Sequence, residues 1–128
     1  MAFEDFLRVR VTRRGARGVT CRCDLRDDLR NGQGVLHGGV AASIADEAAW
    51  HCLLHKYGER ACTTSDLKIN YLRPLDGASI VARAIVLRAG RTFCVSRVDL
   101  IDSQRRLCAV AIVSYMLLDA KPASAKPG

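Results

Sequence analysis

Two groups of residues with catalytic potential lie in one stretch, from Asn31 to Trp50 (NGQGVLHGGVAASIADEAAW). The first group is His37-Gly38-Gly39, at the expected start of a helix. The free N–H groups of a first helical turn, with the positive end of the helix dipole, suit an anion or a polarised carbonyl oxygen. The same residues also fit a plain glycine-rich loop that enters a helix.

The second group is the acidic pair Asp46 and Glu47, in the middle of the same helix. A carboxylate among apolar residues is costly unless something pairs with it or uses it, and aspartate is a poor helix-interior residue. Such a carboxylate suits a nucleophile or a general base. Successive helical residues point about 100° apart, so we expect only one of the two to face a given site. An exposed Asp46 paired with a nearby arginine is the alternative.

The spacing of the two groups constrains where a shared site can lie. Gly38 and Asp46 are eight residues apart, which is about 12 Å along a helix axis. A reacting carbonyl must lie within about 3 Å of both its oxyanion donor and its attacking group. One helix cannot provide both, whereas two antiparallel helices side by side can. If both residues are catalytic, the site therefore lies between the subunits of an isologous dimer.

The elements that must position these residues follow from hydrophobic periodicity. The helix is predicted over residues 39–56 and to stop at Gly58; it is apolar almost all round, which is typical of a buried helix. Alternating apolar residues predict strands over residues 6–14, 19–25, 63–72, 80–87, 92–101 and 107–118. Short links between the strands favour an antiparallel meander curled around the helix. One domain is expected over residues 1–118, and the Pro/Ala/Lys-rich segment 119–128 is predicted to be disordered.

Composition narrows the class of protein. No apolar run approaches a membrane span, and acids stand in the first residues where a signal peptide needs bases, so we expect a cytoplasmic protein with no membrane partner. Six cysteines are then expected to be reduced and structural, and the Cys21-x-Cys23 pair lacks a second pair for a metal site. The formal net charge is +7, but the basic residues are spread and no nucleic-acid reader motif is evident. Nucleic-acid binding therefore rests on charge alone.

The span from Asn31 to Leu118 resembles the hot-dog-fold acyl-CoA thioesterases, in particular the PaaI-like branch of the 4-hydroxybenzoyl-CoA thioesterase superfamily. The resemblance rests on Asn31 six residues before His37, on the His-Gly-Gly turn, and on Asp46 nine residues after His37. It continues in the segments TTSDLKINYLRP (63–74), AGRTFCVSRVDLID (89–102) and LCAVAIVSYML (107–117). It implies an α+β hot-dog fold, in which an antiparallel β-sheet curls around one long central helix.

The resemblance also implies roles for individual residues. The Gly38 N–H would polarise the thioester carbonyl, and His37 and Asn31 would support its loop, with Asn31 helping to place the carbonyl or the attacking water. Asp46 of the neighbouring subunit would be the nucleophile or the general base, and Thr64 would orient the water or the carboxylate. Positions implied to contact substrate or coenzyme A are Gly39, Asp66, Tyr71, Arg73, Gly90, Arg91 and Thr92.

Coenzyme A carries phosphate charges, so Arg73 and Arg91 are the best candidates to bind them, with solvated strand ends as the alternative. Trp50, one turn beyond Asp46, would narrow the acyl pocket or stack on an aromatic acyl group if it faces the site, and otherwise packs in the core. His51 and His55 match no family motif and are expected to be structural or on the surface.

The predicted function is hydrolysis of an acyl-CoA, with a lean towards aromatic acyl groups such as phenylacetyl or hydroxybenzoyl. No metal and no cofactor beyond the coenzyme A of the substrate is expected. The predicted assembly is a homodimer that pairs into a tetramer. The main alternative is a non-catalytic hot-dog module that binds acyl-CoA, and a hot-dog dehydratase or hydratase is a further one.

Overall fold

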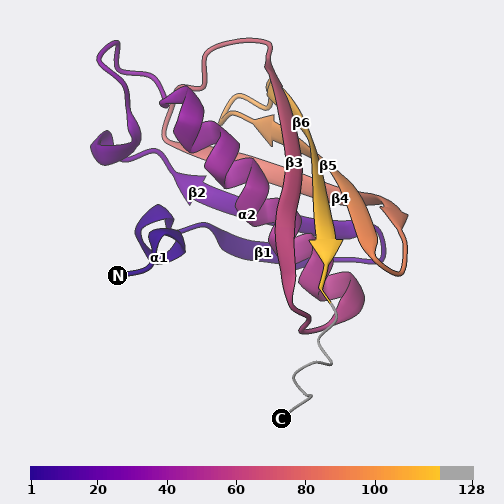
Figure 1. Ribbon diagram of the computed structural model, residues 1–128. Coiled ribbons are helices and arrows are strands. Elements are labelled where there is room, and N and C mark those ends of the chain that lie inside the picture. Colours follow the sequence, from indigo (N-terminus) through magenta and orange to yellow (C-terminus); the bar gives the residue numbers. More distant parts are fainter. Residues whose placement is uncertain (119–128) are drawn as a thin grey trace.

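The computed structural model describes residues 1–118 and consists of one sheet and one long helix (Figure 1). All six strands pair antiparallel, in the order β1-β2-β4-β5-β6-β3. They are β1 (Arg10–Arg14), β2 (Gly18–Asp24), β3 (Cys62–Tyr71), β4 (Ser79–Ala89), β5 (Phe93–Ile101) and β6 (Leu107–Leu117). Helix α2 (Gly38–Tyr57) packs along one face of this sheet. The predicted architecture is confirmed, and the expected disordered segment 119–128 lies outside the described residues.

Helix α2 begins and ends where the sequence indicates. His37 is the N-cap, and its ring accepts a hydrogen bond from the Gly39 N–H at 2.9 Å. At the other end Gly58 has φ 76°, a conformation that favours glycine, and donates its N–H to the Leu54 carbonyl at 2.7 Å. Capping at both ends fixes where the helix starts and stops. It therefore also fixes the separation between the His37-Gly38-Gly39 turn and the acidic pair Asp46 and Glu47.

One stripe of α2 is buried against the sheet, whereas the sequence predicted burial over most of its circumference. The stripe consists mostly of small residues at helical spacing: Ala41, Ile44, Ala45, Ala48, Ala49, Cys52 and Leu53. Small side chains let the helix lie close to the sheet, and the buried apolar area stabilises the pair. The side of α2 that carries Asp46, Glu47 and Trp50 is only half-buried.

The predicted first strand is wrong at its start. Residues Phe3–Leu7 form a short helix, α1, and the strand begins only at Arg10. Two acids in the first turn, Glu4 and Asp5, favour a helix, and Arg8 ends it in the left-handed region at φ 60°. Leu7 alternates in phase with Val9 and Val11 but is buried as a helical residue. A 3-10 turn, η1 (Asp27–Leu29), also interrupts the loop before α2.

The predicted meander is wrong at one connection. Strand β3 does not pair with β4 but lies at the edge of the sheet beside β6. Strand β4 already has β2 on one side and β5 on the other, so β3 finds a partner only beyond β6. The link from β3 to β4 crosses the end of the sheet, where the buried Leu75 accepts a hydrogen bond from the Leu36 N–H at 2.8 Å.

All six cysteines lie in the described part of the chain, and none forms a disulfide there. Five are buried and Cys62 is half-buried. Burial is the main cause that raises the pKa of Cys21 to about 12, so this thiol stays protonated at neutral pH. The burial of these residues agrees with a structural role, and their reduced state stays a prediction. Within residues 1–118, no helix is long and apolar enough to cross a membrane; a cytoplasmic location stays a prediction.

Gly18 is the point at which β2 approaches β4 most tightly. A Cβ atom at Gly18 would lie 1.9 Å from the Ala84 carbonyl oxygen, whereas one at Gly15 in the preceding turn would meet nothing nearer than 4.0 Å. We predict that Gly18→Ala lowers the free energy of unfolding by about 2–3 kcal/mol, because the two strands must move apart. Gly15→Ala is the control and should change it by less than about 0.5 kcal/mol. Urea unfolding measures both, and equal effects would contradict the strand-contact explanation.

Candidate active site

Two hydroxyl groups hold the Asp46 carboxylate. Thr64 on β3 donates its hydroxyl to Oδ1 at 2.9 Å and to Oδ2 at 3.2 Å. Tyr115 on β6 donates its hydroxyl to Oδ1 at 2.6 Å and also contacts the Asp46 backbone carbonyl at 3.0 Å. The carboxylate is thus oriented by the sheet although it belongs to the helix, and its Oδ2 atom has the weaker of these contacts.

Tyr115 is suited to remain a donor to this carboxylate. Its side chain is buried, and this burial, followed by the hydrogen bond to Asp46, raises the pKa of the phenol far above its ordinary value. The hydroxyl therefore keeps its proton throughout the neutral range. Tyr115 was not among the predicted site residues, yet it stands in phase with buried Ala111 and Val113 on β6. A tyrosine in a buried phase needs a partner for its hydroxyl, and this was the signal available in the sequence.

A β-bulge explains why Thr64 reaches the carboxylate and Asp66 does not. Thr64 pairs with Tyr115, but Asp66 pairs with Ser114, so Ser65 is the extra residue. In regular β-structure residues 64 and 66 would share a face; the extra residue puts Asp66 on the opposite face. Asp66 is exposed there. The structure therefore does not bring this predicted substrate-binding residue to the carboxylate.

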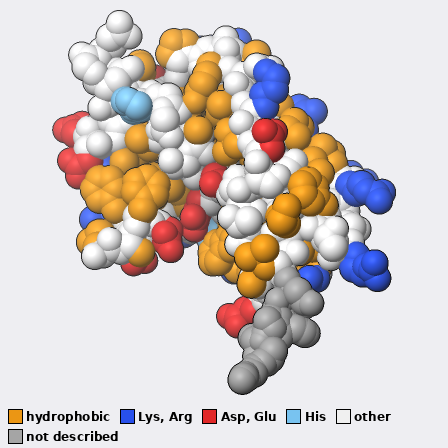
Figure 2. Space-filling view, in the orientation of Figure 1, with side chains coloured by type: hydrophobic (Ala, Val, Ile, Leu, Met, Phe, Trp, Pro, Cys, Tyr) orange, Lys and Arg blue, Asp and Glu red, His pale blue; other side chains and the backbone are white. Residues whose placement is uncertain are grey.

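A cavity of about 440 Å³ opens beside Asp46. Its lining comes from α2, β3, β6 and the short helix α1: Phe3, Glu4, Leu7, Ser43, Asp46, Glu47, Trp50, Cys62, Thr63, Thr64 and Tyr115. In Figure 2 acidic side chains lie in a hollow beside hydrophobic side chains. Glu47 lines the same cavity as Asp46, so the expectation that only one of them meets it is wrong. The Oε2 atom of Glu47 lies 3.4 Å from the Nε2 atom of His51. Trp50 both lines the cavity and packs on the core.

The start of α2 presents one free donor. The Val40 and Ala41 N–H groups bond to the His37 carbonyl, and the Gly39 N–H bonds to the His37 ring. Within residues 1–118 no atom accepts a hydrogen bond from the Gly38 N–H. Because the first N–H groups of a helix have no partner inside it, Gly38 is the donor that remains for a ligand.

Asn31 and His37 hold the loop that leads into this helix. The Asn31 side-chain oxygen accepts hydrogen bonds from the Gln33 N–H at 2.9 Å and the Val35 N–H at 3.3 Å. The His37 N–H bonds to the Leu29 carbonyl at 2.9 Å. Tyr71 donates its hydroxyl to the Gly38 carbonyl. These contacts agree with a supporting role for Asn31 and His37, and any direct part in catalysis stays a prediction.

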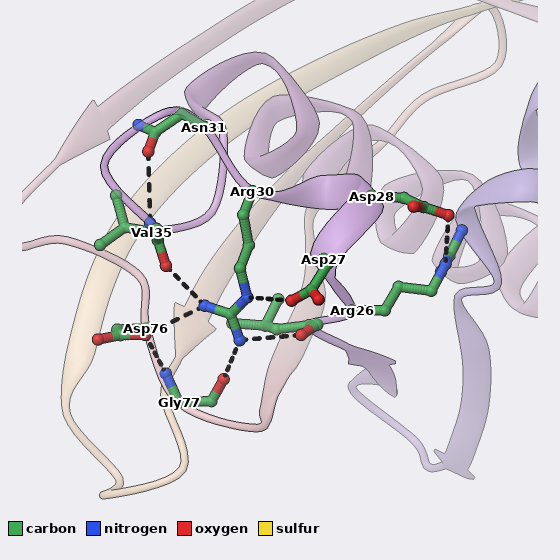
Figure 3. A network of polar contacts seen from close by, with 10 residues as sticks. Arg26, Asp27, Asp28, Arg30, Asn31, Val35, Asp76 and Gly77 are labelled. Carbon is green, nitrogen blue, oxygen red and sulfur yellow. Dashed lines mark hydrogen bonds and ion pairs between the residues drawn. The ribbon is translucent and has the colours of Figure 1, made fainter.

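Arg30 ties this loop to the β3–β4 link, a role absent from the sequence interpretation (Figure 3). Its guanidinium donates to the carbonyls of Leu25 at 2.9 Å, Gly34 at 2.8 Å and Gly77 at 3.0 Å. It also pairs with the carboxylate of Asp76 at 3.2 Å. This pairing, after the hydrogen bond from the Gly77 N–H, lowers the pKa of Asp76. Arginine has enough donors in a fixed fork to make all these contacts together.

The remaining predicted residues fall into two places. Tyr71 and Arg73 line a shallow hollow with Val35 and Leu36, near the start of α2. The segment Gly90, Arg91 and Thr92 lies at the opposite end, where the Tyr57 hydroxyl donates to the Gly90 carbonyl at 2.6 Å. Because α2 has 20 residues and spans about 30 Å, one chain does not bring these two groups together. Residues 1–118 contain no cluster of side chains suited to hold a metal ion.

Comparison with known proteins identifies the family. Residues 33–109 match the model of the Thioesterase superfamily. The chain belongs to the thioesterase superfamily. It is 34% identical over 99 residues to the medium/long-chain acyl-CoA thioesterase YigI of Escherichia coli, a match that covers 66% of this chain and 64% of the relative. Human acyl-coenzyme A thioesterase 13 is 32% identical over 83 residues, which cover 64% of this chain and 59% of that protein. The chain thus spans under two thirds of the length of both these relatives.

Solved structures of this superfamily share the fold. A thioesterase from Haemophilus influenzae superposes with a TM-score of 0.86 at 22% identity, covering 91% of this chain and 82% of that chain. The PaaI protein from the phenylacetic acid degradation operon of E. coli gives a TM-score of 0.82 at 20% identity, covering 92% and 85%. At these identities the likeness shows the fold alone, and it confirms the expected hot-dog architecture.

The Arg30 network makes a prediction about stability. Replacing Arg30, whose side chain is 21% exposed, by methionine leaves three carbonyls and the carboxylates of Asp27 and Asp76 without this partner. Arg30→Met should therefore lower the free energy of unfolding by about 2–3 kcal/mol. The control is Arg22→Met: Arg22 is 47% exposed and lies 3.9 Å from Asp24, so its removal should cost less than about 1 kcal/mol. Urea denaturation measures both variants. If Arg30→Met lowers the free energy of unfolding no more than Arg22→Met does, the Arg30 network does not stabilise the protein as described.

Proposed function

We propose that this protein hydrolyses acyl-CoA thioesters to the free acid and coenzyme A. The observation that carries the proposal is the Asp46 carboxylate, held by Thr64 and Tyr115 at the edge of a cavity in a member of the thioesterase superfamily. Thioester hydrolysis needs one carboxylate and one oxyanion donor. Both are present on α2, and neither requires a metal or a further cofactor.

The chemistry follows one of two routes. In the first, Asp46 accepts a proton from water, whose oxygen bonds to the carbonyl carbon while the C–S bond breaks and the thiolate takes up the proton. In the second, Asp46 attacks the carbonyl itself and the thiolate leaves; water then hydrolyses the resulting anhydride to the acid and the free Asp46 carboxylate, and the proton released from the water goes to the thiolate. Oδ1 accepts both short hydroxyl contacts, at 2.6 and 2.9 Å. Oδ2 is therefore the oxygen with the freer lone pairs, and we assign it the reacting role in either route.

The oxyanion donor in this proposal is the Gly38 N–H of the partner subunit. The separation of about 12 Å along one helix prevents Gly38 and Asp46 of one chain from meeting on one carbonyl. The position of β3 at an edge of the sheet supports a dimer, because an edge strand offers unpaired backbone groups to a second copy. Pairing of dimers into a tetramer stays a prediction.

The roles of the other residues remain proposals. Coenzyme A is proposed to contact two groups of residues from different subunits, because within one chain the groups lie at opposite ends of α2. The groups are Tyr71 and Arg73 near the start of α2, and Gly90, Arg91 and Thr92 at its far end. Gly39 and Asp66 stay predicted contacts without support from the geometry of a single chain. An acyl-CoA-binding module without activity is the alternative, and the orientation of Asp46 by two hydroxyl donors argues against it.

The names of the similar proteins indicate two different classes of acyl group. YigI is named for medium and long acyl chains, whereas PaaI comes from a phenylacetic acid operon. Trp50 and Phe3 on the cavity lining support an aromatic or otherwise extended apolar acyl group. A thiol-release screen over phenylacetyl-, hydroxybenzoyl- and straight-chain acyl-CoAs decides between these classes.

We predict that Asp46→Asn lowers kcat at least about 100-fold, because the amide can neither accept the proton nor attack. Binding of a non-hydrolysable S-alkyl-CoA and the near-ultraviolet circular dichroism should be retained. Asp24→Asn, at the exposed end of β2, is the matched control and should keep full activity. Turnover of Asp46→Asn near that of the control, read by thiol release, would exclude this carboxylate from the reaction.

A mixed dimer tests whether the site is shared. Gly38→Pro removes the free N–H, yet proline suits the first helical position, and His37 already has the extended conformation (φ −62°, ψ 134°) that proline requires of its neighbour. A dimer of one Asp46→Asn and one Gly38→Pro subunit should contain one intact site of two, whereas each parent dimer has none. Gly38→Ala, which keeps the N–H, is the control. Failure of mixing to restore activity would contradict a shared site.

A further inference from the structure

The short helix α1 forms one side of the cavity beside Asp46. Phe3, Glu4 and Leu7 reach the lining from α1, opposite the residues that α2 and β3 contribute. The sequence interpretation placed only Phe6 and Leu7 of this segment in a strand, over residues 6–14, and it assigned Phe3, Glu4 and Leu7 no part in the site. In Figure 2 the hydrophobic side chains that border the acidic hollow lie where Figure 1 places α1.

Contacts with β2 and the following loop hold α1 in this position. The Arg26 guanidinium donates to the carbonyls of Phe6 and Leu7 and lies 4.9 Å from the centre of the Phe6 ring. The Cys23 thiol also donates to the Leu7 carbonyl, at 3.3 Å, and the Leu7 side chain is buried. A helix of five residues is not stable by itself, so these contacts fix its place against the cavity.

We propose that α1 selects the acyl group, through an apolar contact from Phe3 and a charge from Glu4. This inference rests on the proposed function, because it takes the cavity beside Asp46 as the acyl site. Phe3 with Trp50 on α2 gives the cavity two aromatic side chains from different elements. These favour an apolar acyl chain or ring over a short acyl group.

Glu4 adds a second criterion. The cavity has carboxylates on both sides, from Glu4 on α1 and from Asp46 and Glu47 on α2. An acyl group that ends in a carboxylate would bring a further negative charge into this partly enclosed space. Like charges in such a space repel one another more strongly than they do in bulk water. The side of the cavity that α1 forms therefore disfavours binding of acyl-CoAs whose acyl group ends in a carboxylate, relative to acyl-CoAs of the same length with an uncharged acyl group.

The test for Glu4 measures binding and does not depend on turnover. The probes are S-octyl-CoA and its ω-carboxylated counterpart, titrated by calorimetry into the protein. Glu4→Gln should reduce the preference for the uncharged probe by about threefold to tenfold. Asp5→Asn changes the same charge on the same helix at an exposed position outside the cavity lining and should leave the preference unchanged. Equal preferences in Glu4→Gln and wild type would overturn the role of Glu4.

Phe3 has its own test. Phe3→Ala should weaken binding of S-octyl-CoA about fivefold relative to S-ethyl-CoA, because it removes apolar contact area only from the longer chain. Leu87→Ala, which removes an exposed apolar side chain on β4 outside the lining, should keep the wild-type ratio. If Phe3→Ala leaves the ratio of the two affinities unchanged, Phe3 does not contact the acyl chain, and this part of the proposal is overturned.

These measurements separate the two proposals. If wild type binds the probes with the expected selectivity but hydrolyses none of the acyl-CoA panel, the proposed function fails while the role of α1 stands. If hydrolysis proceeds and the substitutions in α1 leave selectivity unchanged, the role of α1 fails alone. Wild-type protein that binds neither probe would overturn both the acyl site and its wall.

Discussion

The close packing of α2 on the curled sheet is the interaction on which the rest of the structure depends. A stripe of small residues, mostly alanine, lets the helix axis lie close to the strands. This packing fixes where the helix starts, and it places Asp46 where hydroxyls from two strands can reach it. Larger residues in the stripe would lift the helix from the sheet and separate the carboxylate from Thr64 and Tyr115, so the packing that stabilises the fold also sets the geometry of the site.

The rigidity of the same helix has a second consequence. It keeps the free Gly38 N–H and the Asp46 carboxylate apart, so in the proposed mechanism each chain would supply two half-sites that cannot serve one carbonyl together. The loop that leads into the helix is held equally firmly, by Asn31 and His37 within the loop and by Arg30 across to the β3–β4 link. Both halves are therefore preorganised before a substrate binds, which is what electrostatic stabilisation of a transition state requires.

Several features of the site depend on contacts between distant segments. The bulge at Ser65 turns Thr64 towards the helix and Asp66 away from it, and spacing in the sequence gives no sign of this extra residue. Helix α1 is held in place by Arg26, Cys23 and the buried Leu7 side chain, whereas the alternation of Leu7, Val9 and Val11 favours a strand that starts before Arg10. The edge position of β3 follows from competition among strands for partners, which local patterns do not record.

Local patterns in the sequence predict the long helix and its ends, the strands after it and buried cysteines, and they single out the Gly38 N–H and the Asp46 carboxylate. These follow from local rules: periodicity, helix capping, and the cost of a carboxylate among apolar residues. Contacts between distant segments bring Tyr115 and Thr64 to the carboxylate, place Glu47 and α1 in the cavity lining, and turn Asp66 away. Each of these depends on strand register or on packing between segments far apart in the chain, and such contacts are set by the whole fold.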